Sequence, residues 1–165
     1  ILDALVRMLA PVLAFTSEEI WKYMPHTEGD NPQSIQLNSW PKVNEEYANP
    51  GLEEKWDRLH QIRDEVLKAL ENARNEKVIG SSLEAGVRLK ASGGDYAFLN
   101  ENRDMLPMIF IVSQVFVEED AGAKTIGIEV LKASGEKCER CWIYSPTVGQ
   151  NHDHPSLCDR CTGVV

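Results

Sequence analysis

The four cysteines of this chain stand in two close pairs, and cysteines at this spacing are typical metal ligands. Cys138 and Cys141 form one C-x-x-C pair, Cys158 and Cys161 form the second, and 16 residues separate the two pairs. This separation lies within the range that marks zinc sites. Two tight C-x-x-C turns can supply the four corners of a tetrahedron. We therefore predict one zinc ion held by these four residues, closed to water and structural rather than catalytic.

The competing interpretations of these cysteines are two disulfides, a redox-active pair and an iron site. Residues 136–165 contain few large apolar side chains, so they cannot bury a core that folds them alone. Metal binding is expected to supply that folding energy. A redox C-x-x-C pair would open a helix after a strand in a larger α/β unit, which is not expected here. His152 and His154 offer alternative ligands but are interpreted as loop residues.

The charge balance excludes indiscriminate binding to phosphate. The 165 residues carry 17 basic and 26 acidic side chains, a formal net charge of −9. Contact with a nucleic acid must therefore be local. No apolar run approaches the roughly 20 residues of a membrane-spanning helix, and no signal-peptide pattern opens the chain. We expect a cytoplasmic protein without a membrane partner. No catalytic motif is present, so no catalytic residue is predicted.

The first half of the chain reads as helices joined by a long loop. Apolar residues recur at helical spacing from Leu2, and Pro11 should interrupt that helix because it lacks an amide donor. Residues 26–50 are rich in Gly, Asn, Ser and Pro and form a connecting loop, in which 34–40 alternate like a short extended piece. Residues 52–77 step by three or four and predict a helix of about seven turns. Together these segments predict part of a helical bundle.

A small strand-helix-strand-strand unit follows. Alternating residues at 87–91 predict a strand, and 96–110 predict a helix that ends near Pro107. Residues 110–119 and 125–133 are rich in Val and Ile and predict two further strands.

The expected fold class is an α+β multidomain fragment with three parts. These are a partial helical bundle over 1–80, the small α/β unit over 81–134, and a zinc ribbon over 135–165.

Several stretches resemble the C-terminal end of bacterial isoleucyl-tRNA synthetases, which are class I aminoacyl-tRNA synthetases. The resemblance spans the whole chain and is carried by "LAPVLAFTSEEIWKYMP", "RNEKVIGSSLEAGVRL", "MIFIVSQV", "SGEKCERCWIY" and "LCDRC". The first stretch is similar to the anticodon-binding bundle that isoleucyl, valyl and leucyl enzymes share. The terminal ribbon is similar to that of isoleucyl enzymes and of some DNA glycosylases, so it points to isoleucine.

This resemblance implies a tRNA-binding portion of an ATP-dependent isoleucine-tRNA ligase. Its implied partners are isoleucine tRNA and the remainder of the synthetase chain. The catalytic signature motifs of the family are absent from these residues, so the fragment is expected to be inactive alone. A truncated bundle exposes apolar surface, so the fragment is also expected to self-associate. The alternatives are a free-standing zinc-ribbon module that binds DNA or a protein, and a purely structural zinc cap.

Four residues of the ribbon are the candidate tRNA contacts. Arg140 and Trp142 flank Cys141, so a bound metal would fix their backbone. An exposed Trp142 ring would offer a platform for an unpaired base, whereas a buried one would only cover the metal. Arg140 is expected to point away from the metal, where its planar group can stack on or hydrogen-bond to a base. Lys137 and Arg160 are candidate phosphate contacts.

Overall fold

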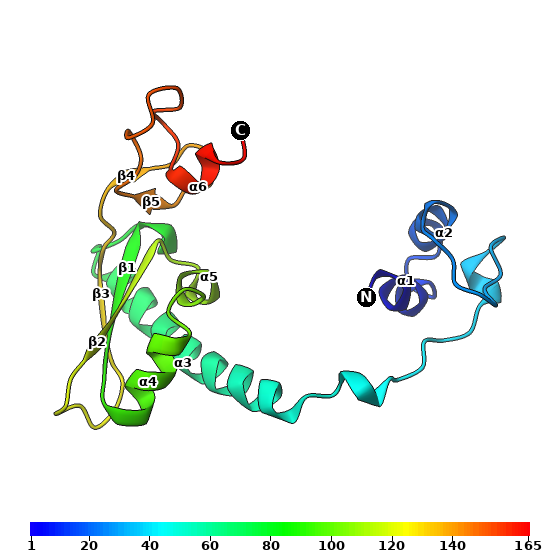
Figure 1. Ribbon diagram of the computed structural model, residues 1–165, viewed down its shortest axis with the longest axis horizontal. Helices are drawn as coiled ribbons and strands as arrows, with labels where there is room; N and C mark the ends of the chain where they lie inside the picture. The colour runs from blue at the N-terminus through cyan, green and yellow to red at the C-terminus, as the bar shows by residue number, and fades with distance from the viewer. The chain divides into compact units, whose positions relative to one another are not determined.

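The backbone separates into two compact units. Figure 1 shows the computed structural model, which describes residues 1–165. The N-terminal unit is Ile1–Pro50 and the C-terminal unit is Gly51–Val165. Each has its own buried apolar cluster. No helix in either unit combines the length and the apolar character that crossing a membrane demands.

Two short helices form the N-terminal unit. α1 (Leu2–Leu9) ends with Ala10 as its C-cap, next to Pro11, and α2 (Ala14–Tyr23) begins after the proline. The predicted interruption is confirmed, and its cause is the missing amide of proline. Both helices contribute to one buried cluster, whose members are Val6, Ala10, Trp21 and Ile35.

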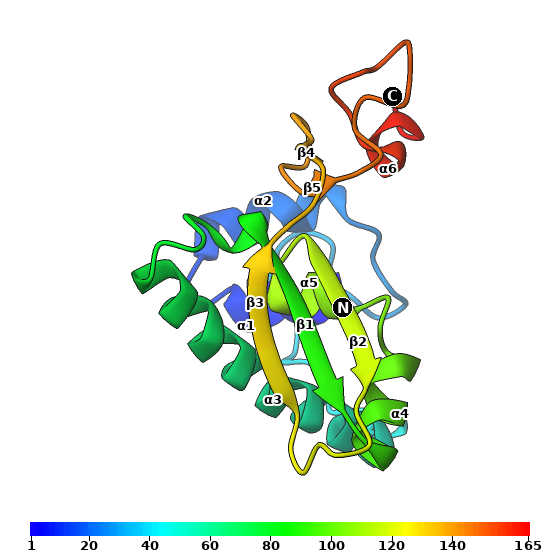
Figure 2. The ribbon, with the colours of Figure 1, turned by 90° about the vertical axis from the view of Figure 1, so that its left-hand side faces the viewer.

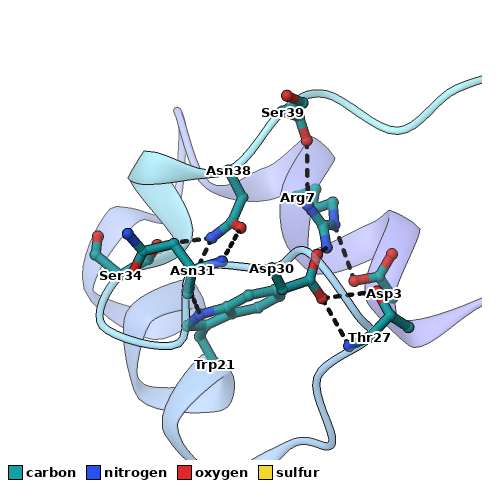
Figure 3. A network of polar contacts seen from close by, with 9 residues as sticks. All are labelled: Asp3, Arg7, Trp21, Thr27, Asp30, Asn31, Ser34, Asn38 and Ser39. Carbon is teal, nitrogen blue, oxygen red and sulfur yellow. Dashed lines mark hydrogen bonds and ion pairs between the residues drawn. The ribbon is translucent and has the colours of Figure 1, made fainter.

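The loop after α2 is tied to the helices by polar contacts, which Figure 3 shows. Arg7 Nη2 donates to Asp30 Oδ1 at 2.7 Å, and Arg7 Nε donates to Asp3 Oδ1 at 2.9 Å. The side chains of Arg7 and Asp30 are only 10% and 11% exposed. The Trp21 indole donates to the carbonyl of Asn31 at 3.0 Å, and the Arg7 guanidinium lies 5.0 Å from the Trp21 ring centroid.

The extended piece predicted for 34–40 is wrong. A 3-10 turn occupies Ile35–Leu37, because the Ser34 hydroxyl accepts the amide of Gln36 and so favours a turn. Ile35 then points into the cluster of the helices rather than into a strand ladder. A second 3-10 turn covers Glu45–Tyr47.

The long helix α3 (Pro50–Asn75) opens the C-terminal unit and confirms the predicted seven-turn helix. Its buried face consists of Leu59, Ile62, Val66, Leu70 and Ala73. This face belongs to the same core cluster as the strands that follow. The first compact unit ends at Pro50, whereas the sequence pattern predicts a first part over 1–80. The apolar face of α3 packs against the sheet.

Three strands form the sheet of the C-terminal unit, in the order β2-β1-β3. β1 (Ala85–Ala91) is central, follows a 3-10 turn at Ser82–Glu84, pairs in parallel with β2 (Gln114–Glu119), and pairs antiparallel with β3 (Gly127–Lys132). All three predicted strands are present, but the second begins at Gln114 instead of at 110, because Leu106–Phe110 is helical. In Figure 2, α3 and α5 lie on the far side of the sheet. The buried side chains of β1 belong to the same core cluster as those of the two helices.

The single helix predicted over 96–110 is two helices. α4 covers Gly93–Glu101 and α5 covers Leu106–Phe110. Pro107 stands in the first turn of α5, where no amide donor is needed, instead of ending a helix. The buried Asn102 closes α4, because its side-chain amide donates to the carbonyl of Phe98 at 2.8 Å.

Candidate metal centre

The last part of the chain, residues 135–165, has little regular structure, and we call it the cysteine module. β4 (Glu136–Lys137) pairs antiparallel with β5 (Tyr144–Ser145), and a short helix, α6 (Asp159–Thr162), follows near the end. The first C-x-x-C pair lies in the turn between β4 and β5. The second spans the start of α6. The elements therefore serve mainly to carry the cysteines.

The four cysteines meet at one point. Their Sγ atoms all lie within 4.8 Å of one another, and those of Cys141 and Cys158 are 3.7 Å apart. Zinc–sulfur bonds of about 2.3 Å in a tetrahedron place sulfurs about 3.8 Å apart, so the spacing fits a tetrathiolate zinc site. Cys141 is half-buried and the other three cysteines are buried. A closed site of this kind suits a structural ion.

Backbone amides already favour the thiolate form at one sulfur. Burial opposes ionisation of Cys138, but amides of Cys141, Cys158 and Arg140 directed at the sulfur outweigh it and lower the pKa of this thiol to about 6. The amide of Cys158 lies 3.4 Å from Cys138 Sγ. Burial raises the pKa of Cys158 to about 12. A coordinating metal ion deprotonates thiols outright, so a bound cation would remove this difference.

Two arginines approach the sulfur cluster. Arg140 Nη1 donates to Cys161 Sγ at 3.9 Å, so the expectation that Arg140 points away from the metal position is wrong. The attraction of the Cys141 sulfur raises the pKa of Arg160. One Zn²⁺ held by four thiolates would carry two net negative charges, which the guanidinium groups of Arg140 and Arg160 would balance. Hydrogen bonds from a guanidinium to thiolate sulfur are charge-assisted, which favours this inward orientation.

The Trp142 ring does not cover the cysteines, because the residue is 60% exposed. Its backbone has a φ of 66°, in the left-handed region, and its amide donates to the carbonyl of Cys138 at 2.8 Å. The ammonium group of Lys137 lies 4.8 Å from the ring centroid. The structure thus brings Lys137 and Trp142 together as an exposed cation–π pair beside the first cysteine turn.

Sequence reasoning missed two residues outside the cysteine module that contact it. Ser113, directly before β2, accepts the backbone amide of Tyr144. Gln114, the first residue of β2, donates to the carbonyl of Tyr144 and to that of Ser134, which directly precedes the module. No spacing motif marks such contacts, because the partners are 20 to 31 residues apart. The one available signal was a Ser-Gln pair interrupting the apolar run "FIVSQVFV".

Two known protein families match this chain, one over its first half and one over its C-terminal end. The anticodon-binding domain of tRNA ligases matches residues 1–89, and the zinc finger found in FPG and IleRS matches residues 135–162. This second match and the sulfur cluster together indicate one structural zinc ion.

The chain is also similar to bacterial isoleucine–tRNA ligases over its whole length. It is 49% identical to that of Caldanaerobacter subterraneus subsp. tengcongensis, covering 100% of this chain and 19% of the relative. It is 50% identical to that of Carboxydothermus hydrogenoformans, covering 100% of this chain and 18% of the relative. The chain thus spans about a fifth of the length of these ligases. Because the anticodon-binding model matches more than half of its residues, the chain belongs to the family of anticodon-binding domains of tRNA ligases.

Proposed function

We propose that this chain is the anticodon-side, tRNA-binding portion of an isoleucine–tRNA ligase. The observation that carries the proposal is the overall identity of 49% and 50% to two such ligases, in alignments that cover 100% of the chain and so include the cysteine module. A free-standing zinc-ribbon module is not favoured, because the similarity extends through the helices and the sheet as well.

The proposed reaction activates isoleucine with ATP and transfers it to the 3′ end of isoleucine tRNA. No catalytic motif occurs in these residues, so the chemistry belongs to the remainder of the ligase chain and this portion is inactive alone. A cytoplasmic location is part of the proposal, because a reducing compartment keeps four clustered thiols available for metal. The contribution of this chain to the reaction is to hold the tRNA.

The remainder of the ligase is the partner we propose for the exposed apolar side chains in the turn between α1 and α2 and at the start of α2. Val12 and Phe15 are 79% and 93% exposed, and Leu13 is 47% exposed. Exposed apolar patches of this kind mark surfaces that other protein covers. The isolated chain is accordingly proposed to self-associate through these residues.

The proposed metal ligands are Cys138, Cys141, Cys158 and Cys161. When bound, the zinc ion supplies the cross-link that the cysteine module needs to fold, because the module has only a small cluster of its own. The residues of the module themselves then set the position of Trp142. The first cysteine turn holds Trp142 in its left-handed conformation, with the ring outside the sulfur cluster.

The proposed tRNA surface centres on Trp142 and Lys137. The module has three basic residues against the acidic Glu136, Glu139, Asp153 and Asp159, so general attraction for phosphate is weak. Stacking is the alternative, and an exposed ring contributes about 1–3 kcal/mol for each stacked base. Arg140 and Arg160 complete the surface, because a guanidinium has five donors and one directed at a sulfur leaves others for RNA.

The test changes Trp142 and Arg140 separately to Ala in the full-length ligase. The efficiency of tRNA charging should fall about tenfold, or roughly 1.4 kcal/mol, for each variant. Activation of isoleucine without tRNA should be unchanged, because it occurs elsewhere in the enzyme. Trp142→Phe should retain much of the charging, since it keeps a stacking ring.

His152→Ala is the matched control, because His152 lies in the same module, fully exposed and outside the sulfur cluster. If the Trp142 and Arg140 variants charge tRNA as well as this control does while zinc stays bound, the module is a structural cap and the proposal fails.

A further inference from the structure

The Ser113 hydroxyl is shared between the α/β unit and the cysteine module. It donates to the carbonyl of Leu83 at 2.5 Å and accepts the backbone amide of Tyr144 at 2.8 Å. Leu83 lies in the 3-10 turn before β1, and Tyr144 begins β5. One small side chain therefore joins the first residue of a strand in the module to the body of the unit.

The neighbouring side chain, Gln114, uses both ends of its amide in the same way. Its Oε1 accepts from the backbone amide of Ser134 at 2.9 Å and from the Ser134 hydroxyl at 3.1 Å. Its Nε2 donates to the carbonyl of Ser134 at 2.8 Å and to that of Tyr144 at 3.4 Å. Gln114 thus hydrogen-bonds to the chain at Ser134, directly before the module, and at Tyr144, directly after the first cysteine turn.

Ser113, Gln114 and Gly135 form the junction between the α/β unit and the cysteine module, which we call the joint. At Gly135 the chain that enters the module passes close to β5. This glycine has a φ of 88°, and a Cβ on it would lie 2.2 Å from the carbonyl carbon of Ser145. Only glycine allows the entering chain to lie so close to β5. The joint is therefore a close backbone contact closed by two side chains, rather than a loose linker.

A short path leads from this joint to the exposed cation–π pair. Tyr144 is the pairing partner of Lys137 in the β4-β5 ladder, and Trp142 is two residues before Tyr144. The Lys137 ammonium lies over the Trp142 ring. A rotation of β5 about the joint would therefore move both residues relative to the sheet.

We propose that Ser113 and Gln114 are positioning residues, which hold the cysteine module in one orientation on the α/β unit and so hold Lys137 and Trp142 where the tRNA meets them. The link to tRNA rests on the proposed function. The claim about orientation rests on the joint alone. The hydrogen bonds of these two residues go to Leu83, Ser134 and Tyr144 and not to a cysteine sulfur or to Trp142, so their effect on the cation–π pair is indirect.

The orientation is tested on the 165-residue chain with zinc bound, by residual dipolar couplings of the sheet and of the cysteine module. One alignment tensor should fit both parts in the wild type. The double variant Ser113→Ala, Gln114→Ala should keep one zinc ion per chain and a folded module, but should require two different tensors. Ser113→Thr alone should behave like the wild type, because it keeps the hydroxyl.

Ser92→Ala is the matched control. The Ser92 hydroxyl also donates to a backbone carbonyl, that of Ala123 at 2.7 Å, but both residues lie within the α/β unit. When the Ser92 hydroxyl is removed, one alignment tensor should still fit both the sheet and the cysteine module. If one tensor still fits the double variant, the joint does not set the orientation and the inference is overturned.

The link to tRNA is tested in the full-length ligase. The double variant should raise the KM for tRNA about tenfold with little change in kcat, and should leave isoleucine activation intact. An unchanged KM, in an enzyme whose charging Trp142→Ala does impair, would overturn the link. If Trp142→Ala is also without effect, the proposed function fails instead, and the dipolar couplings still decide the claim about orientation.

Discussion

The ion pair of Arg7 and Asp30 has a direct effect on acid stability. The Arg7 guanidinium, helped by the amide and hydroxyl of Thr27, lowers the pKa of Asp30 from 3.8 to about 2. A carboxyl group with a lowered folded-state pKa stabilises the fold above its unfolded-state pKa. That stability is lost as the pH falls from about 4 towards about 2.

We predict that acid unfolding of the N-terminal unit in this pH window depends on Asp30. The NMR signal of the Trp21 indole N–H, which donates to Asn31, reports on the unit. In the wild type this signal should weaken as the pH falls through the window. In Asp30→Asn the unit should be less stable at neutral pH, and its stability should change less between pH 4 and 2. Equal pH dependence in the two proteins would contradict the role of this pair.

Residues that act through local spacing were predictable from the sequence, whereas residues that act through distant partners were not. The cysteine pairs carry a spacing signal, and their four sulfurs do meet. The Arg7–Asp30 pair joins residues 23 positions apart, and nothing in the sequence marks either as the partner of the other. The inward turn of Arg140 was missed for a related reason, because its partner is the sulfur of Cys161, 21 residues away.

At the scale of elements, the cysteine module depends on its metal. Its buried cluster consists of Cys138, Cys158 and Cys161, packed with Cys141, Val148 and Leu157. A cluster of this size does not fold a chain segment by itself. Structural zinc supplies about 10–16 kcal/mol of apparent binding free energy in small domains.

We predict that Cys158→Ser releases the zinc ion and unfolds residues 135–165 while α3 and the sheet stay folded. The sheet has a separate core, so it does not need the module. Metal analysis should find about one zinc in the wild type and none in the variant. Amide NMR spectra should lose the dispersed signals of the module alone. Ser156→Ala provides a control in the same loop, and a variant spectrum that still matches this control would contradict the prediction.

Elements with a clear period were also predictable, and those decided by single polar residues were not. The apolar faces of α3 and of the three strands appear in the sequence at their proper spacing. The break between α4 and α5 depends on Asn102 and on the place of Pro107 within a turn, and the 3-10 turn depends on Ser34. Such side-chain hydrogen bonds to the backbone favour a turn or a helix end locally, even where the apolar periodicity predicts a continuous element.

At the scale of the whole molecule, the chain consists of two compact units, and the second contains both the sheet and the cysteine module, which Ser113 and Gln114 link by hydrogen bonds. The three-part division expected from the sequence groups α3 with the helices before it. The structure groups α3 with the sheet, because tertiary packing decides which core an amphipathic helix joins. The sequence pattern predicts which face of α3 is apolar, but not which element that face packs against.

The central claim is that this chain holds the anticodon side of isoleucine tRNA. The most direct measurement is a footprint of that tRNA on the full-length ligase, compared with the same enzyme lacking residues 135–165. The account predicts protection of the anticodon nucleotides in the full-length enzyme and loss of part of that protection in the shortened one, with the acceptor end protected in both. Anticodon nucleotides that stay equally protected without the cysteine module, or that are exposed in both enzymes, would contradict it.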